Sequence, residues 1–86
     1  MSTKISVIVA SFNQKQFLKE AIESVISQTL KPFEIIIADN HSADGSVDMI
    51  RDYAGQYRDW IAALFQEERV PLSKNKNAAL EMVRGA

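Results

Sequence analysis

The chain has 86 residues, of which 47% are apolar and 24% charged, and 10 Lys and Arg against 11 Asp and Glu leave a net charge of −1. This composition is typical of a globular protein, and the length gives room for one modest core, so we expect one domain or part of one. The balanced charge argues against a nucleic-acid partner, and the absence of cysteine excludes disulfides, thiolate metal sites and nucleophilic thiols.

The apolar run near the N-terminus is six residues long. It is too short for the core of a signal peptide and far short of the ~20 residues that cross a bilayer. We therefore expect a soluble, cytoplasmic segment without membrane contact. His41 is the single histidine, which excludes a His-rich metal site.

Short apolar runs alternate with longer helical periodicities along the chain. The runs at 5–10, 33–38 and 61–65 predict three buried strands, because they are almost wholly apolar and rich in β-branched residues. Amphipathic stripes predict a helix after each strand, the last over residues 72–84 with Gly85 as its C-terminal cap. The order βαβαβα with right-handed crossovers predicts an α/β fold in three layers, with helices on both faces of a mainly parallel sheet.

Helix starts and helix faces can also be predicted from the sequence. Asn13 is expected to cap the first helix in a capping box completed by Gln16, while Phe12 and Phe17 form a hydrophobic staple. Ser46 is expected to cap the second helix. Four apolar residues of the third helix are expected to face the core: Leu72, Ala79, Leu80 and Val83.

Ligands of open parallel sheets bind at the carboxyl ends of the strands, which here are the polar, neighbouring loops after Ala10 and Ala38. Neither loop contains the glycines of a dinucleotide-binding fingerprint or a P-loop. Asp39, at the end of the second strand, could accept a hydrogen bond from the ring N–H of uracil or guanine, whereas the corresponding nitrogen of cytosine is an acceptor. The alternative is that Asp39 caps its own loop.

Three segments resemble the N-terminal half of the nucleotide-binding region of family 2 glycosyltransferases: 5–13 (ISVIVASFN), 18–28 (LKEAIESVISQ) and 34–46 (EIIIADNHSADGS). The resemblance implies half of a GT-A (Rossmann-like) fold and an inverting enzyme that transfers a sugar from a nucleotide-diphospho-sugar, expected to be a UDP-sugar, to an acceptor hydroxyl. It also implies that Ser11, Phe12 and Asn13 line the nucleoside pocket and that Asp39 contacts the base.

Three positions depart from the pattern of that family. Asn40 stands at its second acidic position and is assigned to nucleotide binding as a neutral hydrogen-bonding residue. His41 replaces a glycine, and is either an exposed loop residue or a contact to the nucleotide. Lys76 stands where arginine is common in a helix that usually reads Gly-x-Ser-x-Ala-Arg-Asn, and is assigned to the diphosphate, with a solvated charged surface as the alternative.

The Asp-x-Asp motif that holds the divalent ion in that family is absent, since no two aspartates here are separated by one residue. No catalytic or metal-ligating residue is therefore assigned, and Mg²⁺ or Mn²⁺ is expected only of a full-length enzyme. We interpret residues 1–86 as a partial domain that does not transfer sugar by itself. The alternative is a non-catalytic nucleotide-binding or interaction module with the same half-fold.

The first predicted strand has a consequence for association. In the family fold a fourth strand lies beside it, so without that strand residues 5–10 would form an apolar edge. Such an edge is a template for pairing, and we expect self-association through it.

Overall fold

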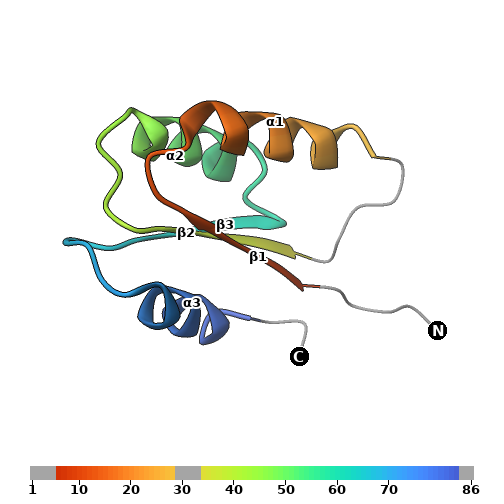
Figure 1. The fold of residues 1–86 in the computed structure, drawn as a ribbon. Coiled ribbons are helices and arrows are strands. Elements are labelled where there is room, and N and C mark those ends of the chain that lie inside the picture. The colour runs from red at the N-terminus through yellow and green to blue at the C-terminus, as the bar shows by residue number, and fades with distance from the viewer. Residues whose placement is uncertain (1–5, 29–33, 84–86) are drawn as a thin grey trace.

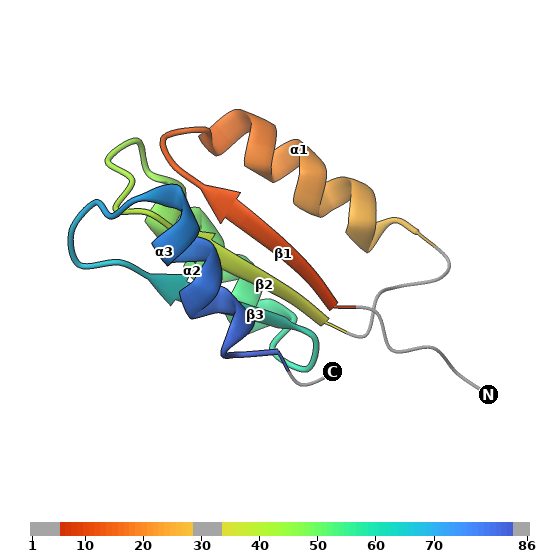
Figure 2. The same ribbon diagram turned by 60° about the horizontal axis from the view of Figure 1, so that its bottom comes forward.

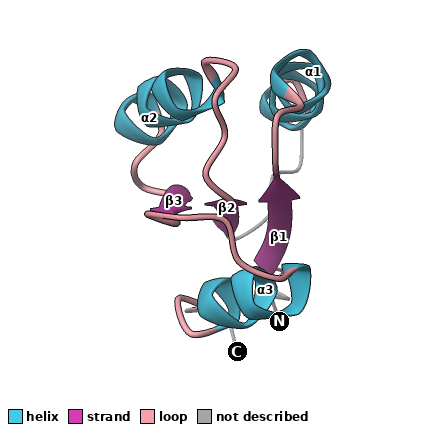
Figure 3. Ribbon diagram, turned by 60° about the vertical axis from the view of Figure 1, so that its left-hand side comes forward, coloured by secondary structure: helices cyan, strands magenta, loops and turns pink. Residues whose placement is uncertain are grey.

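The computed structural model describes residues 6–28 and 34–83. Its elements are β1 (Ser6–Ser11), α1 (Lys15–Ile26), β2 (Glu34–Asp39), α2 (Ser46–Gln56), β3 (Ile61–Phe65) and α3 (Leu72–Leu80). The strands are parallel in the order β1-β2-β3, with α1 and α2 over one face of the sheet and α3 over the other (Figures 1 and 3). The predicted α/β fold in three layers is confirmed.

The central strand β2 determines where the core lies. All six of its residues are buried, and they alternate between the two faces of the sheet. Ile35 and Ile37 belong to the apolar cluster under α1 and α2, whereas Ile36 and Ala38 belong to the cluster under α3. Burying an isoleucine side chain contributes about 1.5–3 kcal/mol, so this strand holds the two helical layers together.

The predicted start of α1 is wrong. The helix begins at Lys15, and its N-cap residue, Gln14, makes no side-chain capping bond. Asn13 lies outside the helix at φ 49°, and its Oδ1 accepts a hydrogen bond from Ala43 N at 2.7 Å. The capping box does not form because the side chain of Asn13 bonds to the loop after β2 instead.

The predicted hydrophobic staple is also wrong, because Phe17 is 72% exposed. The cap predicted for α2 is corrected as well. Gly45 is the N-cap at φ 92°, and Ser46 is buried within the first turn, where its N–H and its hydroxyl both bond to Asp44 Oδ1. Asp44 thus performs the capping that the sequence assigned to Ser46.

The face of α3 that meets the sheet differs from the prediction in part. Ala79 is buried and Val83 packs against the same cluster, but Leu72 is 58% and Leu80 56% exposed. Leu72 lies in the first turn, past the strand ends, and Leu80 is turned about 100° from Ala79 around the helix axis. The buried polar residue of this face is Asn75. Arg84 and Gly85 lie outside the described residues, as do Ile5 and Phe33.

Within residues 6–28 and 34–83, none of the helices combines the length and the apolar character that a bilayer crossing requires.

Candidate functional site

The carboxyl ends of the three strands lie level with one another. The register pairs Ser11 of β1 with Asp39 of β2, and Asp39 with Phe65 of β3. Three loops therefore meet at one edge of the sheet, after β1, after β2 and after β3. The expectation that the first two loops are neighbours is confirmed.

Asp39 is fully buried, and both of its carboxylate oxygens accept hydrogen bonds from Ser42. Oδ1 accepts from Ser42 Oγ at 2.6 Å, and Oδ2 accepts from Ser42 N at 2.9 Å. This is the loop-capping role that was the alternative for Asp39. A contact between Asp39 and a base needs Ser42 to move away, and it stays a prediction.

Asn13 joins the first loop to the second. Its backbone N–H donates to Ser42 Oγ at 2.9 Å, while its side-chain oxygen accepts from Ala43 N. Asp39, Ser42 and Asn13 thus form one continuous chain of hydrogen bonds. His41 precedes Ser42 in the second loop, and its side chain is exposed. Its backbone φ of 62° lies in the left-handed region, which favours glycine.

Asn40 joins the second loop to the third. Its Nδ2 donates to Val70 O at 2.7 Å and its Oδ1 accepts from Val70 N at 2.8 Å, while its own N–H donates to Ser11 O at 2.8 Å. The paired bonds to Val70 require both a donor and an acceptor in one side chain. An ionised aspartate would place an acceptor against the carbonyl of Val70, which explains why an amide stands at this position.

Phe12 is covered by an arginine from the third loop. The guanidinium carbon of Arg69 lies 4.1 Å from the centroid of the Phe12 ring, which is close enough for a cation–π interaction. Ser11, the residue before Phe12, is only 3% exposed, and its hydroxyl has no hydrogen-bond partner among the described residues. The Ser11 hydroxyl is thus without a protein partner in the described residues, whereas the polar side chains of Asn13, Asp39 and Asn40 are all hydrogen-bonded.

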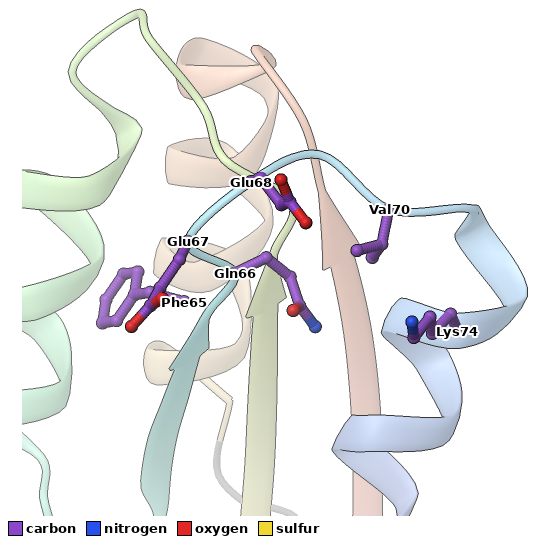
Figure 4. A pocket seen from close by; sticks show the side chains of 6 residues that line it. All are labelled: Phe65, Gln66, Glu67, Glu68, Val70 and Lys74. Carbon is purple, nitrogen blue, oxygen red and sulfur yellow. The ribbon is translucent and has the colours of Figure 1, made fainter.

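Two cavities open at this edge. The smaller has a volume of about 120 Å³ and lies between β1 and α3, lined by Ala10, Ser11, Phe12, Gln14, Asn40, Leu72 and Asn75. The larger has a volume of about 580 Å³ and lies between β3 and α3, lined by Phe65, Gln66, Glu67, Glu68, Val70 and Lys74. Figure 4 shows that Gln66, Val70 and Lys74 border the space between the strand ends and α3, whereas Glu67 lies beside Phe65.

Asn75 lines the smaller cavity and is hydrogen-bonded to Gln66, which lines the larger one. Its Nδ2 donates to Ala38 O at 3.0 Å, and its Oδ1 accepts from Gln66 Nε2 at 3.1 Å. Lys76 is exposed on α3 and lines neither cavity, so its assignment to a diphosphate stays a prediction. The cation that lines the larger cavity is Lys74.

Sequence reasoning missed Asn75, Gln66 and Arg69. Nothing local marks them, because a polar residue on a helix and a charged loop are usually solvated. The pairing of Arg69 with Phe12 depends on two loops 57 positions apart in the sequence. A weak signal was the polar residue Asn75 on the same helical face as Ala79.

Asp44 anchors the second loop at two helix starts. Its Oδ1 accepts from the hydroxyl and N–H of Ser46, and its Oδ2 accepts from Lys15 N at 2.9 Å. These bonds lower the pKa of Asp44, with the Ser46 hydroxyl as the largest cause and the Lys15 N–H next. The ionised carboxylate therefore stabilises the N-termini of both α1 and α2.

The acidic residues of the described ranges do not gather into a metal site. No group of three or more His, Asp or Glu side chains among residues 6–28 and 34–83 could hold a metal ion. These residues therefore do not fit a divalent cation, and the chemistry of this edge is that of hydrogen bonding, stacking and a few charges.

Comparison with known proteins identifies the fold and the family. The sequence model described as glycosyl transferase family 2 matches residues 6–86. A cholesterol galactosyltransferase of Borreliella burgdorferi is 34% identical over 82 residues, which are 95% of this chain and 22% of that protein. An uncharacterised glycosyltransferase of Nostoc sp. is 43% identical over 63 residues, 73% of this chain and 20% of that protein.

A solved structure has the same fold. It is the mannosyltransferase PcManGT from Pyrobaculum calidifontis in complex with GDP-Man and Mn²⁺, with a TM-score of 0.84 and 24% sequence identity, over 99% of this chain and 26% of that one. At this identity the likeness shows the GT-A fold alone. The chain spans between 20% and 32% of the length of the curated relatives that it matches.

Proposed function

Because the chain belongs to glycosyl transferase family 2, we propose that it forms the nucleoside-binding part of an enzyme that transfers a sugar from a nucleotide-diphospho-sugar to an acceptor hydroxyl. The observation that carries this proposal is the meeting of three loops at the carboxyl edge of the sheet. There Ser11, Phe12 and Asn13 lie beside Asp39 and Asn40. In open α/β sheets, ligands bind at this edge.

We propose uracil as the base, and thus a UDP-sugar as the donor. A carboxylate at the end of β2 can accept from the single ring N–H of uracil or from the paired N–H groups of guanine. The structurally similar mannosyltransferase PcManGT was solved in complex with GDP-Man. A binding measurement therefore has to compare GDP with UDP. CDP is expected to bind worst, because its ring nitrogen is an acceptor that faces a carboxylate.

We propose that the divalent ion, Mg²⁺ or Mn²⁺, and the general base belong to other parts of the full-length enzyme. The described residues contain no metal-binding group, and the sequence lacks an Asp-x-Asp motif. The 86-residue chain is accordingly expected to bind nucleotide without transferring sugar. Release of UDP from a UDP-sugar in the presence of Mn²⁺, measured with the purified chain, would contradict that expectation.

A pair of variants tests the role of Asp39 in binding. Asp39→Asn keeps the size of the side chain but removes its negative charge, so the base N–H can bond only to a neutral amide oxygen, and UDP affinity should fall about tenfold. Ser42→Ala is the matched control, because it removes the hydroxyl that occupies Asp39 and leaves the carboxylate intact. Calorimetric titration with UDP, GDP and CDP measures the affinities.

The two variants show whether Asp39 contacts the base or only holds its own loop in place. If Asp39 contacts the base, UDP affinity of Ser42→Ala stays within about threefold of the original chain while that of Asp39→Asn falls. If Asp39 only holds its loop, both variants lose affinity together with thermal stability, and Asp39 is removed from the pocket.

A further inference from the structure

The two carboxylate oxygens of Asp39 accept from two different kinds of donor. Oδ2 accepts from the backbone N–H of Ser42 at 2.9 Å, and Oδ1 accepts from the hydroxyl of the same residue at 2.6 Å. Because Asp39 is fully buried, a ligand reaches a carboxylate oxygen only where the present donor can leave. The two donors differ in this respect.

The backbone N–H of Ser42 is fixed by the hydrogen bonds on either side of it. The next amide, that of Ala43, donates to Asn13 Oδ1 at 2.7 Å. On the other side, the side chain of Asn40 makes two hydrogen bonds to Val70, at 2.7 and 2.8 Å. Withdrawing the N–H would therefore move a stretch of backbone that is attached to the loops after β1 and β3.

The hydroxyl of Ser42 can leave without any movement of the backbone. A rotation about the Cα–Cβ bond, from one staggered rotamer to another, takes it away from Asp39. Ser42 is only half-buried, so water can replace the carboxylate as partner of the hydroxyl. The hydrogen bond that its oxygen accepts from Asn13 N is exposed, and water can replace that one too. Asp39 can thus offer Oδ1 to a base while Oδ2 stays bonded to the protein.

Nucleobases differ in the number of donors that they can set against a carboxylate. Uracil has a single ring N–H at N3, and hypoxanthine has a single ring N–H at N1. Guanine adds an amino group beside its ring N–H, and can donate to both oxygens of one carboxylate. If only Oδ1 is accessible, the amino group of guanine meets a buried oxygen that already accepts from Ser42 N.

We infer that Ser42 determines base specificity. Its backbone N–H limits Asp39 to one hydrogen bond with a base, so the site selects a single ring N–H, as in uracil, and does not recognise the amino group of guanine. The inference rests on the proposed function, in which the ligand is a nucleotide and Asp39 contacts its base. An amino group that is buried without an acceptor weakens binding, which adds to the selection against guanine.

The test compares four nucleotides by calorimetric titration of the full chain: UDP, N3-methyl-UDP, inosine diphosphate (IDP) and GDP. GDP and IDP differ only in the amino group of guanine, so the ratio of their affinities measures whether a second carboxylate oxygen is available. GDP should bind no more tightly than IDP, whereas a second bond to the carboxylate would favour GDP about tenfold. N3-methylation should weaken UDP binding about tenfold, because it removes the ring N–H.

A change in the backbone tests Ser42 itself. An ester in place of the amide between His41 and Ser42 removes the N–H, keeps the side chain and frees Oδ2 of Asp39. GDP should then bind at least about fivefold more tightly than IDP. The matched control is an ester between Ser42 and Ala43. It removes the N–H that bonds to Asn13 and leaves both donors to Asp39 in place, so it should not create a preference for GDP.

The outcomes separate failure of this inference from failure of the proposed function. In the unaltered chain, GDP binding more than about threefold tighter than IDP binding would overturn the inference and leave nucleotide binding standing, even if the ester form at Ser42 does not fold. Equal effects of the two esters would show that loop support is the determinant, and would overturn the inference as well. Unchanged binding of N3-methyl-UDP would overturn both the inference and the base contact of Asp39. Absence of binding by all four nucleotides would overturn the proposed function together with the inference.

Discussion

At the scale of single residues, the polar side chains at the carboxyl edge are used to hold backbone. Asn13 bonds to Ala43, Asn40 to Val70, and Asp44 to Ser46 and Lys15. The backbone N–H and C=O groups of loops are not paired by the hydrogen bonds of a helix or sheet. Burying these groups without a partner costs folding free energy. Short amide and carboxylate side chains can bond to the backbone of a loop or to a ligand. The residue type alone therefore does not show which of these two roles a side chain has.

Tyr53 offers a pH-dependent test at the same scale. Its hydroxyl donates to Glu23 Oε1 at 2.7 Å, and this hydrogen bond, followed by desolvation, raises the pKa of Tyr53 from 10.0 to about 12. Because the pKa is higher in the folded state, the stabilisation is complete below pH 10 and is lost as the pH rises toward 12. In Glu23→Gln, the pKa of Tyr53 should fall toward 10.

Ultraviolet absorbance of tyrosinate against pH measures this titration, and Tyr53→Phe assigns it. Glu20→Gln is the control, since Glu20 lies on the same helix and bonds to Gln16 instead. An unchanged titration curve in Glu23→Gln would contradict the interpretation that Glu23 causes the shift.

At the scale of elements, single polar residues attach helices to distant parts of the fold. Asp44 holds the N-termini of α1 and α2 together. Asn75 attaches α3 to the end of β2 through Ala38 O and to the loop after β3 through Gln66. The bonds of Asn75 and the bond between Asp44 and Ser46 are buried or partly buried, and they also set where the loops between the elements lie.

Asn75→Ala is expected to destabilise the chain by about 2–3 kcal/mol, because the carbonyl of Ala38 and the amide of Gln66 both lose a partner. Urea unfolding measures the change. The matched control is Asn77→Ala on the exposed side of α3, expected within about 0.5 kcal/mol of the original chain. Equal effects of the two substitutions would show that Asn75 contributes only helix propensity.

At the scale of the whole molecule, the sheet of the described residues is open, with β1 at one edge and β3 at the other (Figure 2). Most residues of β1 are only half-buried, whereas those of β2 are fully buried. β1 has no charged residue, and an apolar cavity of about 190 Å³ lies beside it against α1, lined by Val7, Val9, Leu18, Ala21, Ile22, Val25 and Ile35. Charges and prolines are the usual protection of such an edge.

We therefore propose that the 86-residue chain self-associates through β1, and that sedimentation velocity shows its size increasing with concentration. Val7→Lys places a charge on the apolar side of this edge and should shift the chain toward monomer. Gln56→Lys adds the same charge at the exposed end of α2 and should have little effect. A monomer at every concentration would contradict pairing through this edge.

The fold and the candidate site were predictable to different extents. Strand positions, layer order and the nearness of Ser11 to Asp39 followed from runs of apolar residues and from the handedness of crossovers. The predicted bounds of β3, residues 61–65, agree with the structure. The cap predicted for α1 failed because the side chain of Asn13 bonds to Ala43, thirty residues away in sequence, whereas the cap predicted for α2 was misplaced by two residues, from Asp44 to Ser46.

Amino-acid order by itself thus determined which segments are strands and helices and that their polar ends share one edge, because hydrophobic burial follows a local period. The tertiary structure alone decided that Asp39 faces Ser42, that Arg69 lies on Phe12, and that the hydroxyl of Ser11 is left unpaired. Hydrogen bonds and cation–π contacts are directional and act over a few ångströms. Their partners come from different loops, which only the folded sheet brings within that distance.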